Sequence, residues 1–129
     1  ELNSADTKFR VPRRIDGRPH DVEPLGGMLA LLTALYDDNI DAVYIHRGLA
    51  EFRGALDSPF IYVPLDSVIP GLLDHADLPD LAAAVAPRPL RLAGMVDATN
   101  CQLSMADTKQ IFRSTSQLYE REEAADHLS

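Results

Sequence analysis

The stretch Ala86-Pro-Arg-Pro-Leu-Arg-Leu-Ala-Gly-Met-Val-Asp97 decides the fold expected for this chain. Two prolines on either side of Arg88 end any preceding helix, because proline lacks the amide donor that a helix interior needs. The apolar residues after them form a run of the length of one buried strand; they are Leu90, Leu92, Ala93, Met95 and Val96. The run places an acid, Asp97, at its carboxyl end, which is where open α/β sheets hold their functional residues.

The composition is that of one globular domain. The chain has 129 residues, of which 46% are hydrophobic and 25% charged. No apolar run approaches the roughly 18 residues of a membrane span, so we expect no membrane partner. Twelve Lys and Arg stand against twenty Asp and Glu, a net charge of −8. This balance argues against nucleic acid as a partner, since such surfaces need clustered positive charge.

Residues 1–24 differ from the rest of the chain. They are polar, contain several prolines and glycines, and show no sustained hydrophobic period, which predicts an extended or loosely docked arm. Local basic residues are interpreted as a solvated surface of this arm; they are Lys8, Arg10, Arg13, Arg14 and Arg18.

Residues 25–129 alternate between helical and strand patterns. Apolar residues at helical spacing predict a helix over 28–36. Residues 40–45 predict a second strand that is apolar on both faces, which is typical of a parallel sheet covered by helices. The fold class expected is α/β, with a small, mostly parallel sheet flanked by helices.

The remaining segments carry weaker signals. Two helical turns are possible over 49–56, and 60–63 is a short apolar run. Further helices are expected over 67–75, over 77–85 with Asp77 as cap and Pro79 near the start, and from a Ser104/Asp107 capping box to about Glu122. Only two strands are secure, whereas a stable free sheet needs roughly three or more. The sequence therefore predicts a missing partner, either more chain upstream or a second copy in a homo-oligomer.

Two strings resemble one enzyme superfamily. Gly27-Met-Leu-Ala-Leu-Leu-Thr-Ala-Leu-Tyr-Asp-Asp-Asn-Ile40, followed by Ala42-Val-Tyr-Ile45, resembles the helix after the nucleophile elbow and the next strand of α/β-hydrolases. Val68-Ile-Pro-Gly-Leu-Leu-Asp-His-Ala-Asp-Leu-Pro-Asp-Leu81, with the opening stretch, resembles the carboxyl-terminal half of bacterial acetyl xylan esterases and dienelactone hydrolase-like proteins. The resemblance covers about residues 25–122. It implies part of an α/β-hydrolase fold and, as parent activity, hydrolysis of a carbohydrate ester by a serine acyl-enzyme without a cofactor.

The resemblance also implies site residues. In that family a serine lies in a Gly-x-Ser-x-Gly turn, an aspartate follows the penultimate strand and a histidine follows the last strand. The aspartate falls on Asp97. With the final glycine of the turn on Gly27, Leu25 stands at the serine and Glu23 at the first glycine, so the nucleophile elbow is missing. His127 is interpreted as part of a linker toward a strand that the chain does not reach, because the last helix fills most of the interval after Asp97.

Other polar residues have both a functional and a structural interpretation. Asp74, His75 and Asp77 are of metal-ligand type, but their spacing at a helix end serves capping equally well. His46 and Arg47 follow the 40–45 strand, where residues either form a site or simply close the strand.

Cys101 and the Gly26-Gly27 pair are ambiguous in the same way. Cys101, the single cysteine, is a nucleophile only beside a base or a helix terminus and is otherwise an ordinary loop thiol. Gly26-Gly27 before a helix either cradles an anion or allows the chain to enter the helix.

We therefore expect a hydrolase-like segment that lacks its nucleophile and its base, with Asp97 as the retained catalytic acid and no metal or organic cofactor. The alternative from a different class is a non-catalytic interaction module that pairs with another chain through an exposed sheet edge. A third possibility is an esterase completed by residues from a partner.

Overall fold

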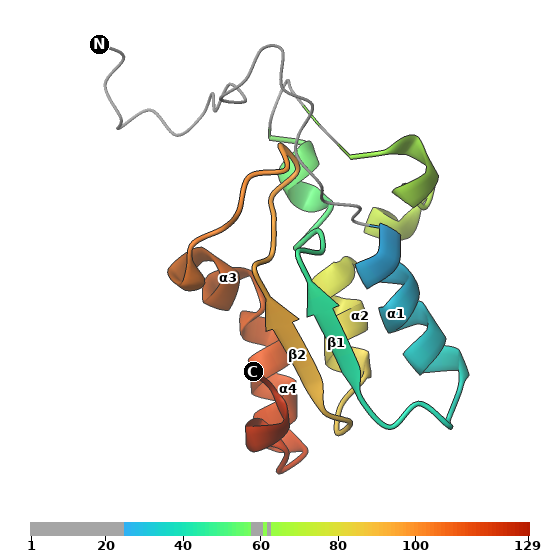
Figure 1. The fold of residues 1–129 in the computed structure, drawn as a ribbon, viewed down its shortest axis with the longest axis vertical. Coiled ribbons are helices and arrows are strands. Elements are labelled where there is room, and N and C mark those ends of the chain that lie inside the picture. Colours follow the sequence, from blue (N-terminus) through green and yellow to red (C-terminus); the bar gives the residue numbers. More distant parts are fainter. Residues whose placement is uncertain (1–24, 58–60, 62) are drawn as a thin grey trace.

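The computed structural model describes residues 25–57, 61 and 63–129. The predicted arm, 1–24, and half of the apolar run 60–63 lie outside the described residues. Helices and strands alternate along the chain, with short 3-10 turns between them (Figure 1). The main elements are α1 (Leu25–Tyr36), β1 (Val43–His46), α2 (Leu78–Ala84), β2 (Leu90–Ala93), α3 (Met105–Ile111) and α4 (Arg113–Arg121).

The sheet consists of β1 and β2 paired in parallel, which confirms the predicted arrangement of these two segments. Val43 lies opposite Leu90, and the pairing runs on to the last residue of each strand. Both strands are then interrupted at the same level, where Arg47 and Gly94 each adopt a φ of 59°. The strand predicted over 90–96 is therefore shorter than expected, because Gly94 takes a left-handed conformation that extended backbone does not allow.

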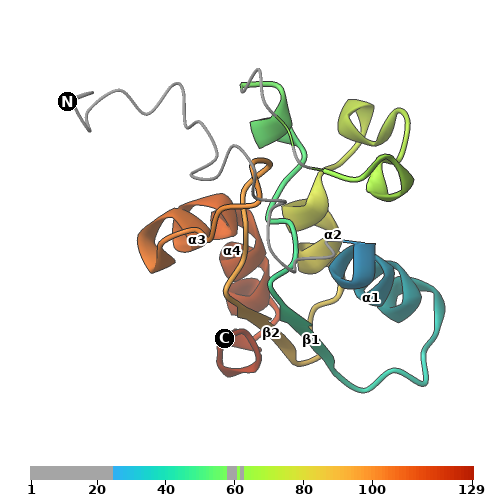
Figure 2. The same ribbon diagram turned by 45° about the horizontal axis from the view of Figure 1, so that its top comes forward.

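Helices cover only one face of the sheet. Figures 1 and 2 show α1, α2 and α4 on the same side of β1 and β2. Val43 and Ile45 point toward them and are 6% and 3% exposed, whereas Tyr44 is 59% exposed. Successive strand residues point to opposite faces, so the prediction that 40–45 is covered on both faces is wrong for β1 in the described part of the chain.

Close approach explains the second of the two glycines at the start of α1, whereas a Cβ on Gly26 would meet no atom within 4 Å. A Cβ on Gly27 would lie 2.9 Å from Ile45 Cγ2 and 3.4 Å from the Gly48 Cα. Helix and strand meet at a distance that a side chain would prevent. Gly26 and Gly27 lie inside α1, which begins at Leu25, and the interpretation as a loop before the helix is corrected accordingly.

The segment between β1 and α2 contains less helix than predicted. In place of a helix over 67–75 there are two 3-10 turns, Leu65–Ser67 and Leu72–Asp74. Pro70 lies between them, and Gly71 has a φ of 77°, which an α-helix cannot accommodate. The helical turns considered for 49–56 are reduced to one 3-10 turn, Arg53–Ala55.

The ends of the helices follow local capping rules. α2 begins where predicted, with Asp77 and Asp80 in a reciprocal capping box and Pro79 in the first turn. The last predicted helix is divided into α3 and α4 at Phe112, whose ψ of 22° departs from helical geometry. The Ser104 hydroxyl accepts from the Asp107 N–H at 3.1 Å and donates to its carboxylate at 2.7 Å, instead of forming the reciprocal box.

The end of the described chain pairs with the sheet. Leu128 forms a parallel bridge with Leu90. The Ser129 N–H donates to the Leu90 carbonyl at 3.1 Å, and the Leu92 N–H donates to the Ser129 carbonyl at 2.7 Å. Leu128 and Ser129, which follow the segment interpreted as a linker, therefore lie beside β2.

The main core lies between the sheet and its helices. Tyr119 of α4 has no exposed surface, and its hydroxyl donates to the Arg88 carbonyl at 2.7 Å. Burial raises the pKa of Tyr119 to about 12. Within the described residues, no helix has both the length and the hydrophobicity needed to cross a bilayer.

Candidate functional site

The loops that follow β1 and β2 are joined to each other by backbone hydrogen bonds. The Val96 N–H donates to the Gly48 carbonyl at 2.9 Å, and the Ala50 N–H donates to the Val96 carbonyl at 2.9 Å. Val96 is 1% exposed. Because the backbone on both sides is fixed in this way, Asp97 is held at the carboxyl end of the sheet, where the sequence predicts it.

Asp97 organises the loop in which it lies. Its Oδ1 accepts from the Thr99 N–H at 2.9 Å, the Thr99 hydroxyl at 2.7 Å and the Cys101 N–H at 3.0 Å. Its own N–H donates to the Cys101 carbonyl at 2.9 Å. These bonds satisfy the structural interpretation of Asp97 as a turn residue. A triad acid also needs a fixed carboxylate, because it can orient a histidine only if it is itself held in place.

Three polar side chains lie near Gly94, which precedes Asp97 by three residues. An added Cβ at Gly94 would lie 3.5 Å from Arg47 Cγ, 3.6 Å from Gln102 Nε2 and 3.9 Å from His46 Nε2. His46 and Arg47 thus lie at the carboxyl end of β1, as predicted, and Gln102 joins them from the loop after β2. This group holds hydrogen-bond donors and acceptors of the kind that bind polar ligands.

Aromatic and charged side chains on the uncovered face of the sheet lie next to this group. The Arg91 guanidinium carbon lies 5.6 Å from the centre of the Tyr44 ring, and the Tyr44 and His46 ring centres are 6.3 Å apart. Arginine over an aromatic face is a favourable electrostatic contact. Arg91 and Tyr44 were not among the predicted site residues, because both lie inside runs whose apolar pattern predicts buried strand.

His127 lies at the other end of the sheet from Asp97. Its Nδ1 is 2.7 Å from the carbonyl oxygen of Pro87, which precedes β2, whereas Asp97 follows β2. The ring is therefore directed to the amino end of the strand. The structure therefore does not bring His127 together with Asp97, and its interpretation as a linker residue stays a prediction.

The polar cluster before α2 has a structural role at Asp77. Asp77 is 5% exposed, and its carboxylate accepts from the Phe52, Arg53 and Leu78 N–H groups. Asp74 and His75 are exposed. Across the described ranges, no group of three or more His, Cys, Asp or Glu side chains is arranged to hold a metal ion.

Glu51 is an acid that the sequence analysis did not single out. Burial raises its pKa from the ordinary value of 4.5, and the nearby negative charge of Asp77 raises it further. The signal available in the sequence was its position between two apolar residues, Ala50 and Phe52, both of which are buried.

Cys101 is a partly buried thiol in the Asp97 loop. Its Sγ lies 3.9 Å from the Thr99 carbonyl oxygen, to which it donates a weak hydrogen bond. This contact fits the interpretation as an ordinary loop thiol.

Comparison of the chain with protein-family models, with curated proteins and with solved structures found no match.

Proposed function

We propose that residues 25–129 are an acetyl xylan esterase-like segment of an α/β-hydrolase, with carboxyl-ester hydrolysis as the parent activity. The observation that supports this proposal best is the position of Asp97 in the loop that follows the second of two parallel strands, with its carboxylate fixed by Thr99 and Cys101. That is the place in the fold where the acid of a hydrolase triad is expected. The parallel pair of strands with helices packed on it is compatible with the α/β class, and its uncovered face departs from the expected cover on both faces.

We further propose that the chain by itself is catalytically incomplete. Leu25, the first residue of α1, stands where the nucleophilic serine is expected, and its side chain carries no nucleophilic group. His127 contacts Pro87 at the amino end of β2. A serine acyl-enzyme needs an activated hydroxyl and a base, since an acid alone only orients and stabilises the imidazole.

An activated acetyl ester tests this proposal. We expect the purified chain to hydrolyse p-nitrophenyl acetate no faster than buffer, and Asp97→Asn to behave identically. Asp66→Asn is the matched control, because Asp66 is an exposed carboxylate on a 3-10 turn. Saturable turnover that Asp97→Asn abolishes and Asp66→Asn preserves would show that the chain is a complete enzyme.

A second function has a specific observation in its favour. Val43 and Arg47 donate their N–H groups toward β2, so the backbone groups of Tyr44 and His46 point to the opposite edge of β1. Within the described chain, that edge has no paired strand. An open edge of this kind pairs readily with another chain. Light scattering at micromolar concentration tests this function, and a stable monomer counts against it.

A further inference from the structure

The space beside Gly94 is bordered by polar side chains from both strand ends. The point where a Cβ would stand on Gly94 lies 3.6 Å from Gln102 Nε2, 3.9 Å from His46 Nε2 and 3.5 Å from Arg47 Cγ. Gly94 leaves this point open because it has no side chain, and its φ of 59° is one that glycine adopts without strain. An atom of a bound molecule at this point would therefore contact all three side chains.

The backbone turns Arg47 toward the same point. Successive strand residues point to opposite faces, so a regular continuation of β1 would direct Arg47 away from His46. Arg47 instead has a φ of 59°, which a residue with a side chain adopts only at a cost. Its N–H donates to the Ala93 carbonyl at 2.8 Å, which holds this conformation. The side chains of His46 and Arg47 consequently approach one point beside Gly94, although they are neighbours in the chain.

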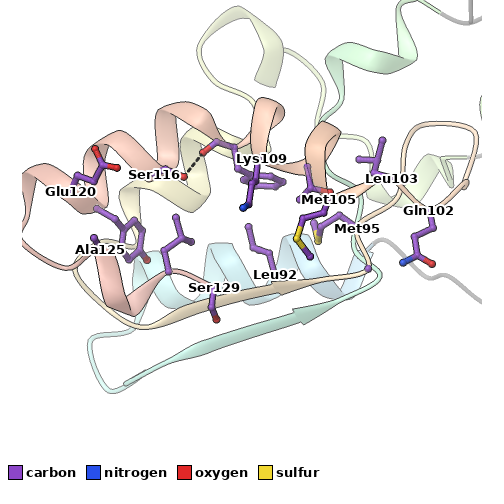
Figure 3. Close-up of a pocket in the computed structure, with 15 residues that line it drawn as sticks. Leu92, Met95, Gln102, Leu103, Met105, Lys109, Ser116, Glu120, Ala125 and Ser129 are labelled. Atoms are coloured by element: carbon purple, nitrogen blue, oxygen red, sulfur yellow. Dashed lines mark hydrogen bonds between the residues drawn. The ribbon is translucent and has the colours of Figure 1, made fainter.

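The loop after β2 holds Gln102 in place. Gln102 forms an antiparallel bridge with Val96, and the Leu103 N–H donates to the Met95 carbonyl at 2.8 Å. Figure 3 shows Gln102 at the rim of the apolar cavity between β2, α3 and α4, with its amide group extending away from Leu103. The amide is therefore available to a molecule that lies beside Gly94.

These side chains have no protein partner in the described part of the chain. There, no residue forms a hydrogen bond with the Gln102 amide or the His46 ring, or an ion pair with the Arg47 guanidinium. Arg91 adds positive charge on the same uncovered face, where its guanidinium lies over the Tyr44 ring. None of the three atoms nearest to the open point belongs to an acid. Guanidinium and N–H groups without an acid among them match the oxygens of an anion.

The charge of the rest of the chain limits the affinity. The net charge is −8, and the nearest acid along the chain is Asp97, three residues after Gly94. The Asp97 Oδ1 already accepts from Thr99 and Cys101, so part of its charge is stabilised within its own loop. Distant carboxylates are screened at physiological ionic strength. We therefore expect millimolar rather than micromolar binding of a small anion.

We propose that His46, Arg47, Gln102 and Gly94 form a binding site for a small oxyanion, which is either a phosphate group or a carboxylate. One anion oxygen lies beside Gly94. Arg47 supplies the charge and can hold two oxygens at once, while the Gln102 amide and the His46 ring supply hydrogen bonds. The site uses neither free edge of the sheet, and the inference does not depend on the proposed hydrolase relationship.

Inorganic phosphate and acetate test the site with the full chain at constant ionic strength. Binding is followed by NMR through the Gly94 backbone amide and the Gln102 side-chain amide. We expect both signals to shift saturably, with a Kd of about 1–10 mM for at least one of the two anions. Tighter binding of phosphate assigns the site to a phosphate group, and tighter binding of acetate assigns it to a carboxylate.

Variants that remove one positive charge locate the binding. Arg47→Gln should weaken it at least about tenfold. Arg121→Gln is the matched control, because Arg121 is exposed at the end of α4, and it should change the Kd by less than about twofold. Arg47→Gly should weaken binding as much as Arg47→Gln while it keeps the fold, because a φ of 59° suits glycine.

Three results would overturn the proposal. Equal weakening by Arg47→Gln and Arg121→Gln would mean that the anion responds only to total charge. Unchanged binding to Arg47→Gly would exclude the guanidinium as a contact. Signals that shift without saturation up to about 50 mM of both anions would show that the site does not form.

Discussion

Replacing Asp77 with alanine tests whether one carboxylate holds the segment after β1 to the start of α2. Its Oδ1 accepts from the Phe52 and Leu78 N–H groups, both at 2.7 Å, and its Oδ2 accepts from the Arg53 N–H at 3.0 Å. Two of these donors lie 24 and 25 residues earlier in the chain. Asp77 is 5% exposed, so water has little access to replace the carboxylate.

The expected loss of stability comes from two effects. Removal of an N-cap costs about 1 kcal/mol. A buried N–H left without an acceptor, here that of Phe52, costs about 1–3 kcal/mol. We therefore expect Asp77→Ala to lower the free energy of unfolding by about 2–4 kcal/mol. Asp77→Asn should lose about 2 kcal/mol, because its amide group places a donor against one of the backbone donors.

Urea denaturation followed by circular dichroism measures both losses, with the slope m as a check that unfolding stays two-state. Asp74→Asn is the control, because Asp74 is an exposed acid three residues away and should change the free energy of unfolding by less than about 0.5 kcal/mol. A value for Asp77→Ala within about 0.5 kcal/mol of the wild type would refute the clamp.

Three further predictions concern the core and one titrating group. Tyr119→Phe removes the donor to the Arg88 carbonyl and should cost about 1 kcal/mol in urea unfolding; no loss would mean that water replaces the hydroxyl. Gly48→Ala places a Cβ 2.6 Å from Ile45 Cγ2 and should lower the free energy of unfolding by about 1–3 kcal/mol. An unchanged melting temperature would contradict this, because it would mean that the Ile45 side chain moves aside without cost. Glu51→Gln should stabilise the fold at pH 7 by less than about 1 kcal/mol. The reason is that the pKa of Glu51 is raised in the folded state, so its contribution to stability is complete below pH 4.5 and is lost as the pH rises through the folded-state pKa. An equal gain at pH 4 and pH 7 would contradict burial of the charge as the cause.

The sequence predicted the pairing of the two strands and the start of α2, because both depend on local signals. The Asp77 cap with Pro79 is read directly from residue type and spacing. The prediction of a helix over 67–75 was wrong because it followed the apolar pattern. Pro70 and the positive φ of Gly71 do not allow a continuous helix there. The break in the second strand has the same origin in Gly94, which looks like an ordinary small residue in an apolar run.

The sequence predicts only those parts of the candidate site that depend on residues close together in the chain. Asp97 and its bonds to Thr99 and Cys101 involve residues two and four positions apart, and aspartate commonly makes such turns. The approach of His46 and Gln102 at Gly94 depends on the register between β1 and β2. Register is a property of the packed sheet and has no signature in either segment alone.

The surroundings of the open β1 edge limit what a partner strand gains there. At the β1 edge the uncovered face presents Tyr44, and Arg91 lies over its ring, so a partner gains backbone hydrogen bonds but little enclosed apolar area. Backbone hydrogen bonds contribute little net free energy, because water offers equivalent partners, whereas buried apolar area contributes roughly 25 cal/mol per Å². A partner strand at the β1 edge therefore gains little net free energy from backbone pairing alone, and contacts with Tyr44 and Arg91 on the uncovered face must supply the rest.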